Sequence, residues 1–127
     1  MSEVPKDLLY SSEHDWLRVE EGLGMTGITD YAQSELGDIV FLELPQVGHR
    51  IQQGESYGTV EAVKTVADLY APVSGKVTDV NSALEEDAAR VNTDPYGEGW
   101  ILKIAIEDQA ELKTLLTPDA YSELIQG

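Results

Sequence analysis

Lys64 is the residue of this chain whose type and surroundings most strongly suggest chemistry. It stands in the stretch YGTVEAVKTVADLYAPVSGKV, among small and β-branched residues, with no Gly, Pro, Asn or Asp directly beside it. A lysine amine becomes a Schiff-base nucleophile when apolar neighbours, here Val63 and Val66, lower its pKa. That chemistry also needs a pocket and an acid–base partner, neither of which the sequence reveals. Taken alone, Lys64 is by default an ordinary surface lysine.

The chain brings little other chemistry of its own. It has no cysteine, and its two histidines, His14 and His49, stand far apart. Disulfides, thiolate metal sites and cysteine nucleophiles are therefore excluded, and no histidine cluster is available for a metal ion. Any sulfur or redox chemistry must be imported. We expect both histidines to be structural.

The net charge is strongly negative. There are 24 acidic and 8 basic residues, which give −16 at neutral pH. Such a charge repels phosphate backbones and anionic lipids, so we expect neither nucleic acid nor membrane as a partner. It keeps the surface solvated, or steers the chain towards basic patches on larger proteins, and both effects can hold.

The N-terminal stretch MSEVPKDLLY has neither a signal-peptide nor a transit-peptide pattern, and no apolar run reaches membrane-spanning length. We expect a soluble, monomeric, cytoplasmic protein, or a mitochondrial-matrix protein if a transit peptide has been removed.

The elements that must position Lys64 are mainly strands. A length of 127 residues with 42% hydrophobic content predicts a single domain over residues 1–127 with its own core. Runs rich in β-branched or aromatic residues, bounded by Gly, Pro or acidic residues, predict strands at DWLRVE, LGMTGI, DIVFLELP and GWILKIAIE. The segment DPYGEGW predicts a turn. The fold class is therefore mainly β.

Three short helices complete the prediction. In TDYAQSELGD, Asp30 and Gln33 have capping-box spacing and Gly37 closes the helix. Near the C-terminus, Asp108 and Glu111 have the same spacing, before an apolar face of Leu112, Leu115 and Leu116. In the last helix, Thr117 caps, Pro118 takes the first position, and the inward side chains are predicted to be Tyr121, Leu124 and Ile125.

Periodicity around Lys64 favours a hairpin over a helix. Helical spacing is present at Val60, Val63, Ala67 and Tyr70. However, the stretch is dense in β-branched residues, which helices disfavour and strands accept. The inward-facing phase of a strand also shifts once between residues 63 and 68, as it would at a hairpin tip. Lys64 then lies at the tip, with Gly54 and Gly75 at similar distances on either side.

Five ordered blocks give the chain a resemblance to a known family. They are SSEHDWLRVE, GITDYAQSELGDIVFLELP, VGHRIQQGESYGTVEAVKTVADLYAPVSGKVTDVNSALE, VNTDPYGEGWILKI and LLTPDAYSEL, and they run from Tyr10 to Leu124. In these residues the chain resembles the H protein of the glycine cleavage system. The resemblance implies a flattened β-sandwich of the lipoyl/biotinyl type, a barrel-sandwich hybrid, with one short helix in the N-terminal half and two near the C-terminus.

The resemblance also implies a role for Lys64 as the amide-linked carrier of lipoic acid. With that arm, the chain would be a carrier in glycine catabolism and one-carbon metabolism, and not an enzyme. It would shuttle an aminomethyl group from glycine decarboxylase (P protein) to the aminomethyltransferase (T protein), and dihydrolipoamide dehydrogenase (L protein) would reoxidise the arm. A lipoyl-attaching enzyme is the fourth implied partner. An extended arm would reach roughly 14 Å from the Lys64 Cα.

The chain departs from the family pattern near the site. Family members commonly have Ser at Ala62, Glu at Asp15, and a small or polar residue at Glu13. Asp68 matches an acidic position that the family places near the aminomethyl group. We expect Asp68, Asp15 and Glu13 to be solvated carboxylates, with Asp68 the first candidate to contact the loaded arm. Glu61 is either a recognition residue for the attaching enzyme or a cross-hairpin partner.

Other carriers fit the flanks of Lys64 less well. A lipoyl domain of a 2-oxo-acid dehydrogenase commonly has Asp before its lysine, where Val63 stands here, and a biotin carrier usually has Met on both sides. An H-like protein that relays lipoyl groups to other acceptors remains an alternative to the glycine shuttle.

Overall fold

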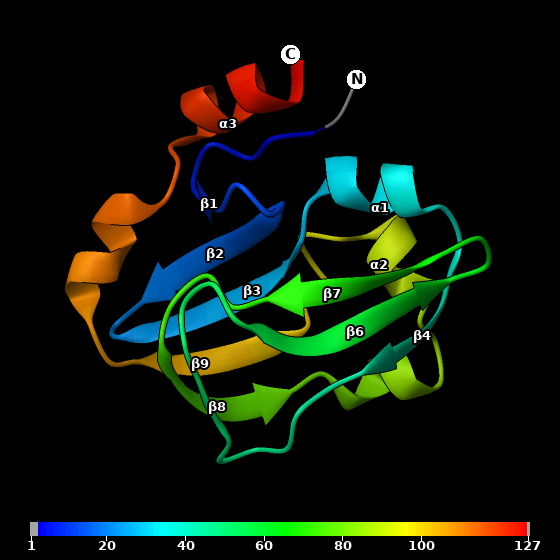
Figure 1. Cartoon of the computed structure of the whole chain (residues 1–127), viewed down its shortest axis with the longest axis horizontal. Helices are drawn as coiled ribbons and strands as arrows, with labels where there is room; N and C mark the ends of the chain where they lie inside the picture. The colour runs from blue at the N-terminus through cyan, green and yellow to red at the C-terminus, as the bar shows by residue number, and fades with distance from the viewer. Residues whose placement is uncertain (1–2, 127) are drawn as a thin grey trace.

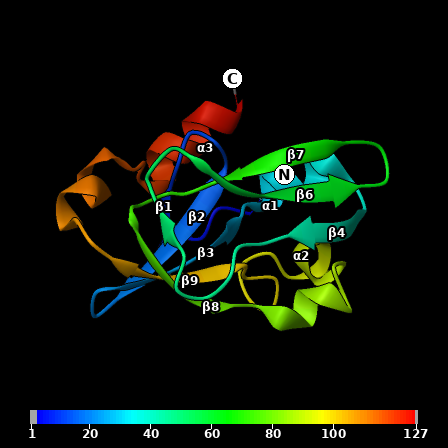
Figure 2. The ribbon, with the colours of Figure 1, turned by 60° about the horizontal axis from the view of Figure 1, so that its bottom comes forward.

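The computed structural model describes residues 3–126, which form two antiparallel β-sheets packed against each other (Figures 1 and 2). The larger sheet has the order β1-β2-β3-β9-β8-β5, with β1 Leu9–Tyr10, β2 Asp15–Glu20, β3 Leu23–Ile28, β9 Leu102–Ile106, β8 Gly75–Val80 and β5 Arg50–Ile51. The smaller sheet has the order β4-β6-β7, with β4 Ile39–Glu43, β6 Ser56–Ala62 and β7 Val66–Tyr70. The predicted β-sandwich is confirmed, and the DWLRVE and LGMTGI strands have the predicted bounds.

The main core lies between the two sheets. Leu17 and Ile104 from the larger sheet and Val60 and Leu69 from the smaller one are each at most 1% exposed. Burying an aliphatic side chain of this size contributes about 1.5–3 kcal/mol relative to leaving it in water. This shared core holds the β6–β7 hairpin against the larger sheet.

Within residues 3–126, five short helical segments connect and cover the sheets. They are α1 Asp30–Leu36, the 3-10 helix η1 Ser82–Glu85, α2 Arg90–Thr93, the 3-10 helix η2 Gln109–Thr114 and α3 Pro118–Gln126. The sequence prediction missed η1 and α2. No helix within residues 3–126 is long and apolar enough to cross a membrane.

The first helix begins one residue away from the predicted cap. The N-cap is Thr29, which has an extended backbone and whose Oγ1 accepts the Ala32 N–H, so the prediction of Asp30 as the cap was wrong. The Asp30 carboxylate instead accepts from the Gln33 side chain at 2.8 Å. Gly37 ends the helix with φ +82, as predicted, because a residue without Cβ adopts this conformation at little cost.

Two predictions for the C-terminal segments were wrong in detail. The Asp108 side chain caps η2 by accepting the Ala110 N–H, but Glu111 does not complete a capping box, because its carboxylate binds Ser74. In α3, Tyr121 is fully buried as predicted, whereas Leu124 is 46% exposed. The buried face of α3 is therefore narrower than the apolar pattern suggested.

A second, aromatic core lies where α3 covers the N-terminal segment. Its buried members are Leu8, Tyr10, Trp16, Tyr96 and Tyr121. The Trp16 indole donates to the Pro95 carbonyl at 2.9 Å, which joins this core to the predicted DPYGEGW turn. Figure 1 shows α3 beside β1, and Tyr10 and Leu116 form a two-way backbone bridge at this point.

Candidate functional site

Lys64 stands exposed at the tip of the β6–β7 hairpin, which confirms the hairpin prediction over the helix alternative. The tip is fixed on two sides. The Ala62 N–H donates to the Thr65 carbonyl at 2.8 Å across the turn, and the Val63 N–H donates to the Asp38 carbonyl at 2.9 Å. The backbone that carries Lys64 is therefore held by its own hairpin and by the segment between α1 and β4.

The tip turns without Gly or Asn. The non-glycine residues with positive φ within residues 3–126 are His14 and Glu21, so Val63, Lys64 and Thr65 all turn in ordinary backbone conformations. This geometry explains why the sequence around Lys64 carries no turn signal.

The Lys64 side chain lies against the end of α1. Its Cε is 3.5 Å and its Nζ 4.0 Å from the position that a Cβ on Gly37 would occupy. Gly37 directly follows Leu36, which lines a neighbouring cleft. The amine is thus exposed to solvent and lies beside one end of that cleft.

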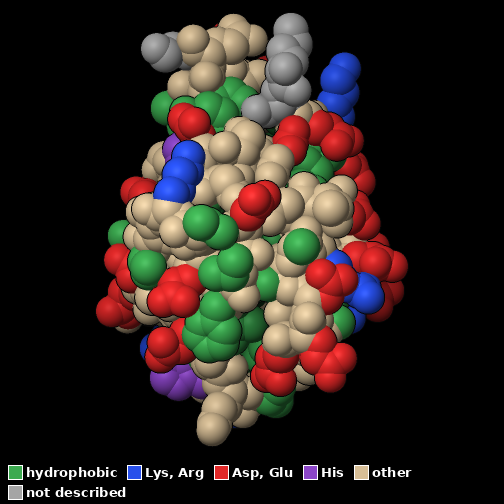
Figure 3. All heavy atoms as spheres, turned by 90° about the vertical axis from the view of Figure 1, so that its right-hand side faces the viewer, with side chains coloured by type: hydrophobic (Ala, Val, Ile, Leu, Met, Phe, Trp, Pro, Cys, Tyr) green, Lys and Arg blue, Asp and Glu red, His purple; other side chains and the backbone are tan. Residues whose placement is uncertain are grey.

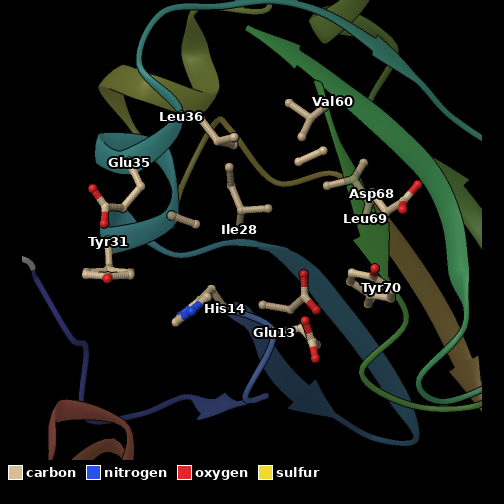
Figure 4. Close-up of a pocket in the computed structure, with 13 residues that line it drawn as sticks. Glu13, His14, Ile28, Tyr31, Glu35, Leu36, Val60, Asp68, Leu69 and Tyr70 are labelled. Atoms are coloured by element: carbon tan, nitrogen blue, oxygen red, sulfur yellow. The ribbon is translucent and has the colours of Figure 1, made fainter. Parts of the chain in front are cut away.

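The cleft has a volume of about 410 Å³ and lies between α1 and β7 (Figure 4). Figure 4 shows Tyr31 and Glu35 of α1 on one side, Asp68 and Tyr70 of β7 on the other, and Glu13 and His14 across one end. The floor is apolar and the rim is acidic. Floor residues are Ile28, Leu36, Val60 and Leu69, and rim carboxylates are Glu13, Glu35 and Asp68.

This arrangement suits a flexible aliphatic group that ends in a cation. The apolar floor can cover methylene groups, and exposed carboxylates at the rim can accept hydrogen bonds from an ammonium. Asp68 is exposed, as predicted, and the Ser56 hydroxyl lies 3.4 Å from its Oδ1. Glu13 is exposed as well.

The prediction that Asp15 is a solvated carboxylate was wrong, because only 2% of its surface is exposed. It begins β2 opposite Ile28, and its Oδ2 accepts a hydrogen bond from the Ser11 hydroxyl at 3.1 Å. Burial raises the pKa of Asp15 well above its usual value, and the Ser11 hydrogen bond opposes this only in part. Asp15 therefore lies at the base of the cleft wall, while Glu13 and Asp68 face solvent.

Sequence reasoning missed the contribution of α1. Tyr31 and Glu35 are one turn apart on the helix and both line the cleft. A signal was present, because polar residues four apart on a short amphipathic helix share one face. His14 also lines the cleft and contacts Tyr121, whereas the His49 side chain is exposed in a surface turn.

The surface around the tip is apolar with an acidic border. Val63 and Val66 are 75% and 59% exposed, and Phe41 on neighbouring β4 is 51% exposed. Glu61 lies between them, opposite Phe41 on one side and Val66 on the other. Figure 3 faces this end of the molecule and shows hydrophobic side chains with acidic ones around them. Glu61 has cross-strand neighbours and is also accessible, so both of its predicted roles remain open.

A two-sheet sandwich that displays a lysine on a hairpin defines a carrier domain of the lipoyl and biotinyl type. The comparisons with known proteins narrow this class. A family model described as glycine cleavage H-protein matches residues 8–127. A glycine cleavage system H protein from Carboxydothermus hydrogenoformans is 56% identical over 126 residues, which are 99% of this chain and 97% of the relative. One from Rubrobacter xylanophilus is 51% identical, over 99% of this chain and 98% of the relative.

The fold comparison agrees with the sequence comparisons. A crystal structure of a glycine cleavage system H protein from Mycobacterium marinum has a TM-score of 0.87 and 38% identity, covering 98% of this chain and 100% of that one. The chain belongs to the glycine cleavage H-protein family, the lipoyl carriers of the glycine cleavage system.

Proposed function

We propose that Lys64 carries lipoic acid in amide linkage and that residues 1–127 act as one lipoyl-bearing unit. The unit shuttles the aminomethyl group of glycine between the decarboxylase, the aminomethyltransferase and the dihydrolipoamide dehydrogenase, after a separate enzyme has attached the lipoate. The observation that carries this proposal is the exposed Lys64 on a fixed tip beside an acidic cleft. Bound lipoate would supply the disulfide that takes up the aminomethyl group as it is reduced and that becomes a dithiol after release, in a chain without cysteine.

The dimensions of the site fit such an arm. Asp68 is four residues beyond Lys64, as the third residue of β7, so their Cα atoms lie at most about 13 Å apart. The arm reaches roughly 14 Å from the Lys64 Cα when extended. The end of the arm can therefore lie at the level of Asp68 while its methylene groups lie over Leu36 and Val60.

The cleft residues bind the cargo and exclude water from it. The aminomethyl group ends in an ammonium, and a carboxylate partly screened from water holds it by a charge-assisted hydrogen bond of about 1.5–3 kcal/mol. Asp68 is the first candidate because it lines the cleft at the level that the arm reaches. Glu13 and the buried Asp15 are further candidates at the other end.

The exposure of the tip argues against a Schiff-base enzyme. A lysine nucleophile needs an apolar environment to lower its pKa. Val63 and Val66 point largely into solvent and do not bury Lys64. We therefore assign Lys64 a carrier role and the chain no catalytic group.

Intact mass spectrometry tests the attachment. Protein from lipoate-replete cells should carry one lipoyl amide, and Lys64→Arg should remove it without loss of fold. Lipoylation that persists in Lys64→Arg would overturn the assignment. Borohydride trapping of the unlipoylated chain with simple carbonyl compounds should give no selective adduct at Lys64, because such an adduct would support the Schiff-base alternative.

Reconstitution tests the shuttle. Lipoylated protein should support glycine-dependent formation of methylenetetrahydrofolate with the three partner enzymes. A protein that is lipoylated, inactive in this assay, and able to supply lipoyl groups to other acceptors would instead be a lipoyl relay.

Ammonia release tests the protective role of Asp68. Loaded Asp68→Asn, kept without transferase, should release ammonia faster than the loaded parent. Asp79→Asn is the matched control, because Asp79 is exposed on β8 and does not line the cleft. Equal rates for Asp68→Asn and the parent would exclude Asp68 from the protective role. Faster release from Asp15→Asn would assign that role to the N-terminal segment around Asp15.

A further inference from the structure

We propose that Tyr121, on α3 and outside the cleft, is a positioning residue. Its hydroxyl fixes two walls of the cleft, α1 and the segment around His14, relative to each other. The proposal rests on the sheltering role proposed for the cleft. The Tyr121 hydroxyl lies 2.7 Å from the Thr29 Oγ1 and 2.9 Å from the His14 Nδ1. These partners are 92 and 107 residues away in sequence, and the Tyr121 side chain is fully buried.

The Thr29 contact fixes the α1 wall. Thr29 is the N-cap of α1, and its Oγ1 accepts the Ala32 N–H at 3.2 Å as well as bonding to Tyr121. The same helix supplies Tyr31 and Glu35 to the cleft. The hydrogen bond from Tyr121 to this N-cap therefore fixes the start of α1, and with it the position of the helix face that lines the cleft.

The His14 contact fixes the N-terminal wall. His14 lies between Glu13 and Asp15 and has φ +71, a conformation that non-glycine residues adopt only when their surroundings hold them in it. Its N–H donates to the Ser11 carbonyl at 3.1 Å, and its carbonyl accepts the Thr29 N–H at 3.0 Å. The Tyr121 hydroxyl fixes the ring, and burial lowers the pKa of His14, which favours the neutral form.

The Tyr121 hydroxyl thus bonds to one residue of each wall, His14 and Thr29. These two residues are also joined directly, by the backbone hydrogen bond between them. A tyrosine hydroxyl can donate one hydrogen bond and accept others, so it can serve both partners at once. Without it, the His14 ring would lose its hydrogen bond and keep only its packing against Tyr31, while the backbone of the turn would keep its hydrogen bonds to Ser11 and Thr29. His14 and the neighbouring Glu13 would then be held less firmly relative to α1, whereas Asp15 would keep its place in β2.

Tyr10 provides a matched control within the same core. Its ring stacks on Tyr121 with centroids 4.6 Å apart, and it too is fully buried. Its own hydroxyl, however, donates to the Pro5 carbonyl and contacts no residue of the cleft lining. Replacing either tyrosine by Phe removes one hydroxyl and keeps the stacked pair.

The experiment compares the lipoylated, loaded parent with loaded Tyr121→Phe and Tyr10→Phe in the absence of transferase. Tyr121→Phe should release ammonia faster by about threefold or more, because the hydroxyl makes two hydrogen bonds and the loss of one alone corresponds to about threefold to tenfold. Tyr10→Phe should release it at the parent rate, although urea denaturation should show that this variant also loses stability, because its hydrogen bond to Pro5 is removed. Equal release from Tyr121→Phe and the parent, or equal acceleration in both variants, would overturn the proposal.

Amide hydrogen exchange gives a second readout that does not need the arm. The Thr29 N–H, which bonds to His14, should exchange faster in Tyr121→Phe than in Tyr10→Phe, and unchanged exchange would contradict a positioning role. Loaded free lipoamide separates this proposal from the proposed function. If it releases ammonia no faster than the loaded parent, the cleft gives no shelter, and its proposed protective role fails together with the role of Tyr121. If the parent is protected and Tyr121→Phe is equally protected, only the role of Tyr121 fails.

Discussion

The Glu111 carboxylate receives two hydrogen bonds from a single residue, Ser74. The Ser74 N–H donates to its Oε1 at 2.7 Å and the Ser74 hydroxyl to its Oε2 at 2.8 Å. Ser74 is 6% exposed and immediately precedes β8. This pair attaches η2 to the connection between the smaller and the larger sheet.

Removing the Glu111 side chain should therefore destabilise the fold. Glu111→Ala leaves the buried Ser74 N–H without a partner, which we expect to lower the free energy of unfolding by about 1–3 kcal/mol. Urea denaturation measures the change. Glu123→Ala is the control, because Glu123 is exposed on α3 and should change stability by less than about 0.5 kcal/mol. A Glu111 variant as stable as this control would show that water replaces the carboxylate.

Asp15 should make stability depend on pH in an unusual direction. Its pKa is raised in the folded state by burial, so the folded protein holds this proton more tightly than the unfolded chain, where the pKa is about 3.9. The stabilisation by the neutral form is present below that value and is lost as pH rises towards the folded pKa. Over this window Asp15 should lower the free energy of unfolding by up to about 1.4 kcal/mol per pH unit.

The matched variant for this prediction is Asp15→Asn, which keeps the shape and cannot ionise. Its stability relative to the parent should grow as pH is raised from about 4, where the unfolded carboxyl begins to ionise. Urea titrations at several pH values would show the difference. A constant difference between the two proteins across that range would mean that Asp15 is already ionised when folded.

The two glycines that flank the hairpin at similar distances from Lys64 should respond differently to substitution. Gly54 has φ +85 and open space around it, so Gly54→Ala should cost about 1–2 kcal/mol, and Gly54→Asn less. At Gly75 a Cβ would collide with the Ala105 carbonyl oxygen of the neighbouring strand. Gly75→Ala should cost about 3 kcal/mol or more, and Asn should not rescue it. Thermal or urea unfolding of the four variants checks the contrast, which rescue by Asn at residue 75 would contradict.

The net charge of −16 should accelerate encounter with a basic partner surface. Raising ionic strength from about 0.01 M to about 0.15 M shortens the screening length from about 30 Å to about 8 Å, so the association rate should fall while dissociation changes less. Stopped-flow binding to the decarboxylase or the aminomethyltransferase would measure both rates. An association rate that does not change with salt would leave solubility as the role of the charge.

The sequence correctly predicted those elements whose conformation is determined mainly by neighbouring residues. The runs Asp15–Glu20 and Leu23–Ile28 have strand length and strand-forming residues and meet at Gly22, which has positive φ, so their predicted bounds were correct. The hairpin at Lys64 followed from a shift in alternation, although no turn residue marks it. Two-residue strands such as β1 and β5 are too short to give a pattern.

Two of the errors, at Asp15 and Glu111, concern residues whose packing or hydrogen bonding depends on segments far away in sequence. Asp15 sits in the polar run SSEHD, and its burial depends on the packing of β2 against elements that follow it. The spacing of Glu111 from Asp108 predicts a capping box, but the Glu111 carboxylate instead accepts two hydrogen bonds from Ser74, 37 residues earlier. The cleft is formed by α1, β7 and the segment around His14, which are far apart in the sequence. Single lining residues such as Asp68 could therefore be predicted, whereas the cleft could not.

The fixed tip at Lys64 has a kinetic consequence. Because hydrogen bonds from Ala62 and Val63 hold the anchor, the end of an attached arm would search a half-sphere around a stationary point. With a radius of roughly 14 Å, that volume corresponds to an effective concentration of about 0.3 M for the cleft. A partner enzyme in the cell is far more dilute than that. It must therefore dock first and then compete within the same half-sphere, so the order of events in each transfer is set by the rigidity of one turn.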